Sequence, residues 1–328
     1  MAIPKRKCTF GLAMATAYNH QPAAPAHVLV CNAGLEGEPF TYEQINTMTP
    51  DNADIQAAGF NYAFNVSNIE PNITQAGYIM AAAFGGDTIV SDAHQIIPSQ
   101  DSKWLALYRD LQTQIGSSAA LVTEVGLGAK IASMSFEVSR RKFCQMAIGG
   151  AFCNLGAEMA TLTKALPAFP LSWHSLRAGD YKIGINGVAV ASNREITGFK
   201  MDYQRQQNTE ENITLDSDQP NDITEGGRTF DFEVTRQMSG AQARAERDAW
   251  KGGQEIALEV TMATDPTGTP QSLKIEVPHS RITGSYVGEI GDGEDPVIAT
   301  LKVRAFKKST DPIIRITADD NTVVAWAA

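Results

Sequence analysis

The sequence has few of the residues around which enzymatic and metal sites are usually built. Its 328 residues include 5 histidines and 4 cysteines, and these are scattered without a CxxC pair. It also lacks GxSxG, HExxH, a Walker loop and a GxGxxG that follows a strand. We therefore expect no enzyme, no cofactor and no metal ion. The separated cysteines are expected to be reduced thiols of a chain made in cytoplasm: Cys8, Cys31, Cys144 and Cys153.

Long apolar runs are also missing. The longest, around Ile79–Phe84, is much shorter than the roughly 20 residues that a membrane-spanning helix needs. The opening MAIPKRKCTFGLAMA has a basic start but no sustained apolar segment, so it is a poor signal peptide. The sequence predicts no association with a membrane.

Basic residues are outnumbered, with 27 Lys and Arg against 37 Asp and Glu and a net charge of −10. Proteins that grip nucleic acid by its phosphates depend on Lys and Arg, so this balance argues against that class. It does not exclude a protein that DNA touches without being held. Much of the acidic excess lies between Tyr203 and Arg228, which we predict to be one long polar loop between two strands.

What the sequence has in abundance is β-strand patterning. In TFDFEVTRQM, Phe230, Phe232 and Val234 alternate with polar residues, which predicts a half-buried strand with one apolar face. Short runs rich in β-branched and aromatic residues predict further strands at Lys130–Ser139, Phe143–Cys153, Tyr181–Val190, Glu195–Gln204, Leu273–Pro278 and Ile298–Phe306.

Helical patterns are rare. Ser99–Thr113 has apolar residues at three- and four-residue spacing after a polar cluster, which predicts a surface helix. Ser239–Lys251 predicts a second, more polar helix that Gly252 ends. Thr74–Phe84 fits a buried helix, but its apolar run is short enough that a strand remains an alternative.

A proline-containing stretch without periodicity, Leu166–Gly179, divides the chain into near-equal halves. We place a linker at 171–179 between domains at 1–170 and 180–328. In each half, strands are followed by a predicted helix, a strand and a closing strand pair, which indicates an internal duplication. The alternative is one large β domain with additions at its front end.

Several stretches together resemble the major tail tube protein of phages with long, non-contractile tails. They are LAMATAYNHQPAAPAHVLVCNAG, AGYIMAAAFGGDTIV with IIPSQDSKWLALYRDL, VGLGAKIASMSFEVSRRKFCQMAIGGAFCN, YKIGINGVAVASNREITGFKMDYQRQQNTEENITLDSDQPNDITEGGRTFDFEVTRQM, IATLKVRAF and DPIIRITADDNT. The resemblance is one of pattern and covers most of the chain. The basic turn SRRKFCQ departs from it, because the family usually has a glycine-rich turn there.

The resemblance implies a mostly β fold with two tail-tube-type β-sandwich or barrel lobes, each with a flanking α-helix, and long inter-subunit loops. The first lobe would carry an N-terminal arm. It implies a structural protein that self-assembles into stacked rings around a channel for viral DNA ejection, and the two halves favour a trimeric, pseudo-hexameric ring over a hexamer.

The implied partners are further copies of the chain, the tail-tip or distal tail, tape measure and tail terminator proteins, and passing double-stranded DNA. The implied location is the virion tail, assembled in the cytoplasm of a bacterial host. The alternative function is a β-rich binding module of another virion or secretion assembly, such as a fibre, an adhesin or a secretion-tube relative.

An acidic channel wall would repel DNA and keep it moving. The candidates for lining this channel are Asp202, Asp231 and Glu233. Alternatively, these acids face the exterior or pair with Arg236 and Lys200.

The candidates for contacts between rings are of opposite charge. The loop residues are Gln207, Asn208, Glu210, Glu211, Asp216, Asp218, Asp222 and Glu225. The basic residues are Lys5, Arg6, Lys7, Arg140, Arg141 and Lys142. The alternative is an ordinary solvated loop and ordinary turns.

Overall fold

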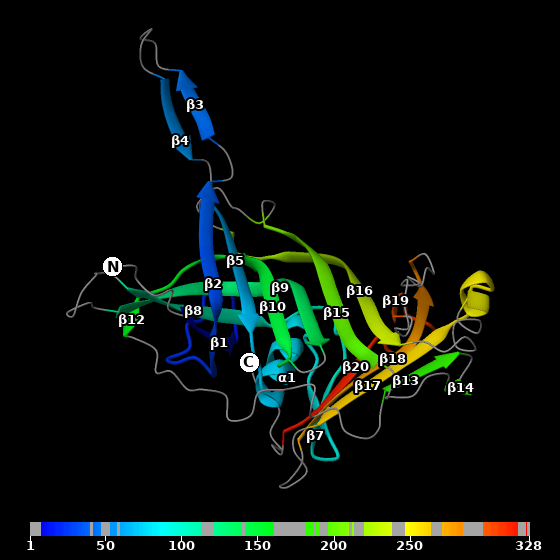
Figure 1. Cartoon of the computed structure of the whole chain (residues 1–328). Coiled ribbons are helices and arrows are strands. Elements are labelled where there is room, and N and C mark those ends of the chain that lie inside the picture. Colours follow the sequence, from blue (N-terminus) through cyan, green and yellow to red (C-terminus); the bar gives the residue numbers. More distant parts are fainter. Residues whose placement is uncertain are drawn as a thin grey trace, which may run out of the picture.

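Strands are the dominant elements in the computed structural model of the protein. The structure describes residues 8–39, 42–46, 53–57, 60–112, 121–139, 142–160, 181–185, 188–189, 196–209, 212, 220–237, 247–263, 271–284, 298–320 and 326. The predicted mostly-β class is confirmed, and the strands pair antiparallel in one large sheet (Figure 1).

The first half of the chain contains β1 (Cys8–Ala15), β2 (His27–Pro39), β3 (Tyr42–Asn46), β4 (Ala53–Ala57), β5 (Phe60–Ile69), α1 (Ile73–Phe84), β6 (Thr88–Val90), β7 (Ala93–Ile96), β8 (Trp104–Gln112), β9 (Leu121–Ser139), β10 (Gln145–Phe152), β11 (Asn154–Leu155) and β12 (Met159–Ala160). The second half contains β13 (Tyr181–Ile185), β14 (Val188–Ala189), β15 (Ile196–Asn208), β16 (Thr224–Gln237), β17 (Ile256–Ala263), β18 (Ser272–Ile282), β19 (Ile298–Ala305) and β20 (Arg315–Asp319).

Eight strands form a continuous row in the order β2, β5, β10, β9, β15, β16, β19, β18. Each half supplies four of them. The two halves meet where β9 pairs with β15, from Ser139 opposite Gly198 to Ser133 opposite Gln204. The sheet therefore runs through from one half of the chain to the other.

The inner side of this row is apolar because the strands alternate. In β16, Phe230, Phe232 and Val234 are buried, while Asp231 and Glu233 lie on the partly exposed side, as TFDFEVTRQM predicts.

Helix α1 covers the apolar side of the sheet, which confirms the buried-helix interpretation of Thr74–Phe84. It begins with a capping box, in which the Asn72 side chain accepts a hydrogen bond from the Gln75 backbone N–H at 2.8 Å. It ends at Gly85, whose φ of +83° and close approach to the Asp101 carbonyl leave no room for a side chain. Phe84 packs against Tyr203 and Phe230 of the second half, with 5.2 Å between ring centroids in both contacts.

The predicted helix Ser99–Thr113 is wrong, because Trp104–Gln112 is the strand β8, which pairs with β1 and β9. Leu105, Ala106, Leu107 and Tyr108 are all fully buried. A strand buried on both faces has no period-two pattern, so its apolar residues fell at helical spacing by coincidence.

For the predicted helix Ser239–Lys251, residues 247–251 are helical, and the Gly252 N–H donates to the Asp248 carbonyl at 2.9 Å. The segment 239–246 lies outside the described residues.

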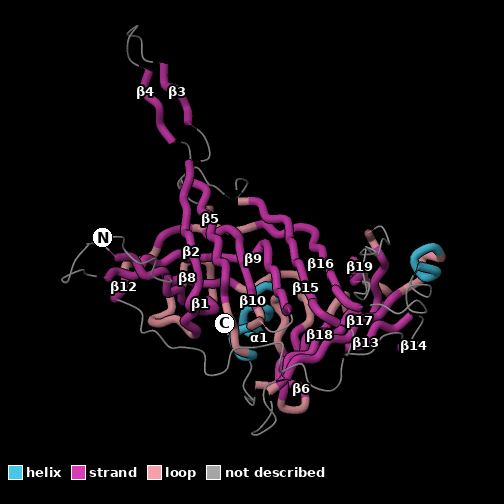
Figure 2. The backbone as a smooth tube through the Cα atoms, in the orientation of Figure 1, coloured by secondary structure: helices cyan, strands magenta, loops and turns pink. Residues whose placement is uncertain are grey.

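A long hairpin arm leaves the sheet between β2 and β5. Pro39 faces Phe60 where these strands end, and Tyr42 faces Ala57 in the β3–β4 pair beyond, so both pairs keep one register. Figure 2 shows β3 and β4 projecting well away from the rest of the strands. Among the described strands, β3 and β4 therefore pair only with each other, which leaves the outer edge of each without a strand partner.

The predicted linker at 171–179 lies outside the described residues. Elements from the first half nevertheless pack on the second: β7 pairs with β20 from Ile96 opposite Ile316 to His94 opposite Ala318, and α1 contacts β20 and β18. The division at 171–179 stays a prediction.

Candidate functional site

The outer side of the sheet carries charged residues in two rows that cross several strands. One row runs from Glu137 through Lys200 and Glu233 to Lys302, with the sign of charge alternating at every strand. The next row runs from Asp202 through Asp231 and Arg304 to Arg281. We call these eight residues the paired-charge face. Four of them are acidic and four are basic.

Most of these charges are joined in close ion pairs. The Lys200 ammonium lies 2.7 Å from Asp202, and the Lys302 ammonium lies 2.7 Å from Glu233. Arg304 donates two hydrogen bonds to the Asp231 carboxylate, from Nε at 2.7 Å and from a terminal nitrogen at 2.9 Å. The Arg281 guanidinium lies over the Phe306 ring. The register therefore places Glu233 and Asp231 beside bases of β19, whereas Asp202 lies opposite Asp231 and pairs with Lys200 of its own strand.

These pairs favour the charged forms of their members. The hydrogen bond to Asp202 is the main cause that raises the pKa of Lys200, with further contributions from Glu233 and Glu137. The hydrogen bond to Asp231 raises the pKa of Arg304 in the same way. Because these side chains are 31–56% exposed, each pair stabilises the fold by about 0–1 kcal/mol at most.

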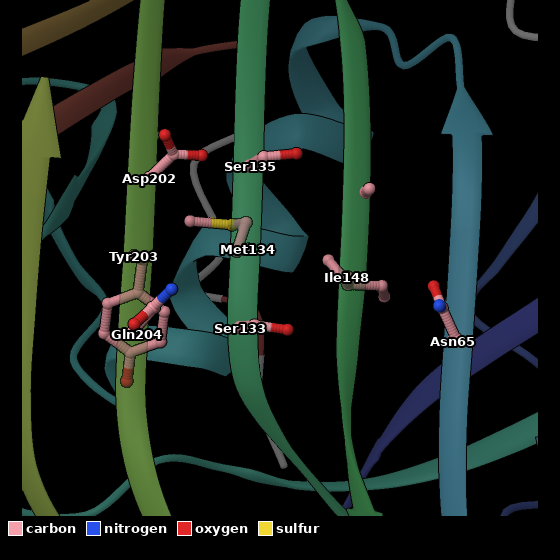
Figure 3. A pocket seen from close by; sticks show the side chains of 9 residues that line it. Asn65, Ser133, Met134, Ser135, Ile148, Asp202, Tyr203 and Gln204 are labelled. Atoms are coloured by element: carbon pink, nitrogen blue, oxygen red, sulfur yellow. The ribbon is translucent and has the colours of Figure 1, made fainter. Parts of the chain in front are cut away.

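Beside the charged rows, the side chains on the same face are mostly small or uncharged. A hollow of about 140 Å³ lies over β5, β10, β9 and β15 (Figure 3). Its lining includes the hydroxyl and amide groups of Asn65, Ser133, Ser135 and Gln204. Asp202, which belongs to the second charged row, also lines it. This part of the face can donate and accept hydrogen bonds but has little charge.

The three predicted channel residues, Asp202, Asp231 and Glu233, lie together on the paired-charge face. Asp202 pairs with Lys200, as one alternative foresaw, whereas Arg236 is fully buried. The pairing of Asp231 and Glu233 with β19 was missed, because β19 is distant in sequence and no local pattern indicates its register. Whether this face lines a channel stays a prediction.

The predicted loop Tyr203–Arg228 is wrong at both ends. Strand β15 continues to Asn208 and β16 begins at Thr224, so Gln207, Asn208 and Glu225 belong to strands. The Gln207 side chain donates to the Lys130 carbonyl at 3.1 Å and accepts from the Ala151 N–H at 3.1 Å. Polar residues continue these strands because backbone pairing, rather than apolar side chains, holds them.

Of the remaining loop candidates, Asp222 is described, and its side chain is 55% exposed. Glu210, Glu211, Asp216 and Asp218 lie outside the described residues.

Glu225 lies at the centre of a second charged site, which is buried. Its carboxylate accepts hydrogen bonds from the Ser102 N–H at 3.0 Å and the Ser102 hydroxyl at 2.6 Å. Lys130 and Arg205 each approach it within 3.3 Å, and both of these side chains are at least 93% buried. We call Ser102, Lys130, Arg205 and Glu225 the buried charge cluster. Because Glu225 is only 2% exposed, its carboxylate cannot serve as a contact to another ring.

Among the predicted basic residues, Lys142 is exposed on the turn between β9 and β10, where its N–H donates to the Ser139 carbonyl at 3.1 Å. Its neighbour Phe143 is 50% exposed. Lys5, Arg6, Lys7, Arg140 and Arg141 lie outside the described residues.

Two histidines lie in clusters with acidic residues. His94 is buried between Asp87, at 3.1 Å, and Asp320, at 3.6 Å. Trp326 stacks on the His94 ring with 3.5 Å between ring centroids, and its backbone N–H donates to Asp87 at 2.9 Å, so Trp326 itself is held against the core. The other cluster joins His279 to Glu255 and Asp311 on the surface.

Within the described part of the chain, no three His, Cys, Asp or Glu residues are grouped as they would be to hold a metal ion. No helix among the described residues has the length and apolar character needed to cross a membrane. Comparison with protein-family models gives no match, and comparison with curated proteins gives none either.

Proposed function

We propose that the chain is the major subunit of a phage tail tube, which assembles into stacked trimeric, pseudo-hexameric rings around a channel for DNA. The proposal is supported by a topological repeat, by an open sheet edge and by the hairpin arm. It places the protein in the virion tail, after assembly in the host cytoplasm. Its expected partners are further copies of itself and the tail-tip, tape measure and terminator proteins.

The observation that carries the proposal is the repeat of one strand arrangement in the two halves. In the sheet, the first half runs β2, β5, β10, β9 and the second runs β15, β16, β19, β18, which in both cases is the chain order first, second, fourth, third. Each second strand is followed by a helix, α1 or residues 247–251. In the same way, β1 pairs with β8 beside β9, and β13 pairs with β17 beside β18.

This repeat favours two tube-type lobes in one chain. If each lobe fills one position of a six-position ring, three chains close the ring. The helix that matches residues 247–251 is α1, and not the predicted Ser99–Thr113.

The outer edge of β2 suits assembly. Its residues 27–31 pair with β1, but among the described strands nothing pairs with this edge beyond Cys31, where β5 occupies the other edge. An unprotected strand edge is a template for pairing with another chain. A head-to-tail contact that closes by rotation produces a ring and removes such edges.

The hairpin arm is suited to contact a neighbouring subunit. It extends beyond the sheet as a two-stranded hairpin, and such a hairpin by itself is marginally stable at best in water (Figure 2). In this proposal the arm packs against a neighbouring copy, and the outer side of the sheet, with Asp202, Asp231 and Glu233, faces the channel.

Electron microscopy of the concentrated, purified chain tests the proposal. We expect hollow tubes of uniform diameter, and rotational averaging should show three chains in each ring. A variant in which residues 40–59 are replaced by a short Gly-Ser turn should stay folded but assemble poorly, because it lacks the hairpin arm. A stable monomer that forms no rings, even with a tail-tip partner, contradicts the proposal and favours the alternative of a β-rich binding module.

A further inference from the structure

Lysine and arginine side chains on a surface that DNA passes are a hazard to its passage. Each cation that reaches a phosphate releases counterions and adds to the affinity, and many copies along a tube would hold the duplex. The outer side of the sheet nevertheless contains Lys200, Lys302, Arg304 and Arg281. The question is how a surface with these residues could avoid binding DNA.

The ion pairs provide an answer, because a carboxylate lies beside three of these cations, across the strand register for Lys302 and Arg304 and along one strand for Lys200. Lys200 is held by Asp202, Lys302 by Glu233 and Arg304 by Asp231, and the contacts are all 2.7–2.9 Å long. The Arg304 pair is bidentate, which uses two of the donors that would otherwise match a phosphate. Arg281 is packed over the Phe306 ring. A phosphate that approaches any of the three paired cations therefore meets the negative charge of the carboxylate beside it.

The charge balance of the face differs from that of the whole chain. The chain carries a net charge of −10, yet the paired-charge face has four acids and four bases. A net negative charge on these eight residues therefore cannot be the reason why the face would not bind DNA. The neighbouring hollow adds serine, asparagine and glutamine side chains, which carry no charge at all.

Stability alone is a weak reason for these pairs. They are partly exposed and contribute about 0–1 kcal/mol each, and uncharged threonines can occupy exposed strand positions equally well. Thr235 and Thr300 occupy such positions in the adjacent row.

We propose that the paired-charge face is a surface past which double-stranded DNA slides, and that Asp202, Asp231 and Glu233 keep its cations away from the phosphates. The acids act by occupying Lys200, Lys302 and Arg304, so removal of an acid makes the face adhesive. The location of this face in a channel rests on the proposed function, whereas the masking of the cations does not.

The masking is tested first on the soluble, unassembled full chain with a 25-base-pair duplex. The double variant Asp231→Asn/Glu233→Gln frees Arg304 and Lys302. We expect it to bind the duplex more tightly than the unmodified chain. The slope of log K against log salt should steepen by about 0.9 for each freed cation that contacts a phosphate.

Two controls separate masking from a simple change in net charge. Glu255→Gln/Asp311→Asn changes the net charge by the same amount at the surface histidine cluster, but it frees one lysine, Lys308, instead of two cations. It should raise duplex binding less than the face variant. Adding Lys302→Gln and Arg304→Gln to the face variant should return the binding to that of the unmodified chain.

Location is tested on assembled tubes, because only linear DNA can enter a channel from its end. Tubes of the face variant should retain linear duplexes and not closed circular plasmid, whereas tubes of the Glu255/Asp311 variant should not discriminate. Equal retention of both DNA forms by the face variant would place the face outside the channel and overturn that part.

The soluble assay decides the masking whether or not tubes form. Duplex binding by the face variant that equals the binding of the unmodified chain, or of the Glu255/Asp311 variant, overturns the inference. If the chain forms no tubes, the proposed function fails, while the soluble result still supports or overturns the masking.

Discussion

Two sites in this protein use the same chemistry in opposite surroundings. The buried charge cluster joins Glu225 to Lys130 and Arg205 with less than a tenth of each side chain exposed. The paired-charge face joins Asp231 to Arg304 with 36% and 56% of these side chains exposed. Water can replace a lost partner on the face but not in the cluster. Similar distances therefore imply very different energies.

The largest effect is expected from Glu225→Gln. The variant leaves Lys130 and Arg205 buried without their counter-charge, which costs about 3–5 kcal/mol. Urea unfolding followed by circular dichroism measures the loss. The matched control is Asp222→Asn, since Asp222 is 55% exposed and 4.0 Å from Lys130. It should change stability by less than about 0.5 kcal/mol.

The pairing within the cluster can be isolated with a double-mutant cycle. Lys130→Met and Glu225→Leu together should cost about 1–3 kcal/mol less than the sum of the single variants, since each single change leaves a buried charge. Recovery should stay partial, because Arg205 also loses its counter-charge and Ser102 its hydrogen-bond acceptor. Additive single effects would show that burial has not coupled the two residues.

His27 shows the effect of burial on a group that titrates near neutral pH. Burial lowers the pKa of His27 below its usual 6.5, with Asp320 opposing this in part. The unfolded chain then binds the proton more readily, so stability is fully present above pH 6.5 and falls as pH drops below it, by up to about 1.4 kcal/mol per pH unit.

His27→Phe keeps a ring against Tyr78, which His27 contacts at 4.5 Å, and cannot be protonated. Thermal unfolding between pH 8 and 5.5 should therefore show a weaker pH dependence for this variant. His20→Asn, at an exposed histidine, is the matched control, and the pH dependence of His27→Phe should be weaker than that of this control. An unaltered profile for His27→Phe would exclude His27 as its source.

The contrast also explains how far the sequence could be interpreted. TFDFEVTRQM predicted its strand correctly, because its alternation is local and one of its faces is buried. WLALYRDLQ was mistaken for a helix because Leu105–Tyr108 are buried on both faces of their strand, a property that only the tertiary structure determines.

The two charged sites differ in the same respect. The outward position of Asp231 and Glu233 followed from alternation, and their partners on β19 did not. The burial of Glu225 could not be predicted from its acidic stretch, because its partners Lys130 and Ser102 lie 95 and 123 positions away in the sequence.

The smallest effect is expected from Asp231→Asn on the exposed face. Although this variant removes a bidentate pair, water solvates Arg304, so the unfolding free energy should fall by no more than about 1 kcal/mol. The coupling of Asp231→Asn with Arg304→Gln should shrink further in 1 M salt, where the Debye length is about 3 Å. The coupling of Lys130 with Glu225 should persist in the same salt, because the cluster excludes solvent ions. A salt-resistant coupling of 3 kcal/mol or more at Asp231 would contradict the view that exposure governs these pairs. It would also give the face a structural role that the masking of cations does not require.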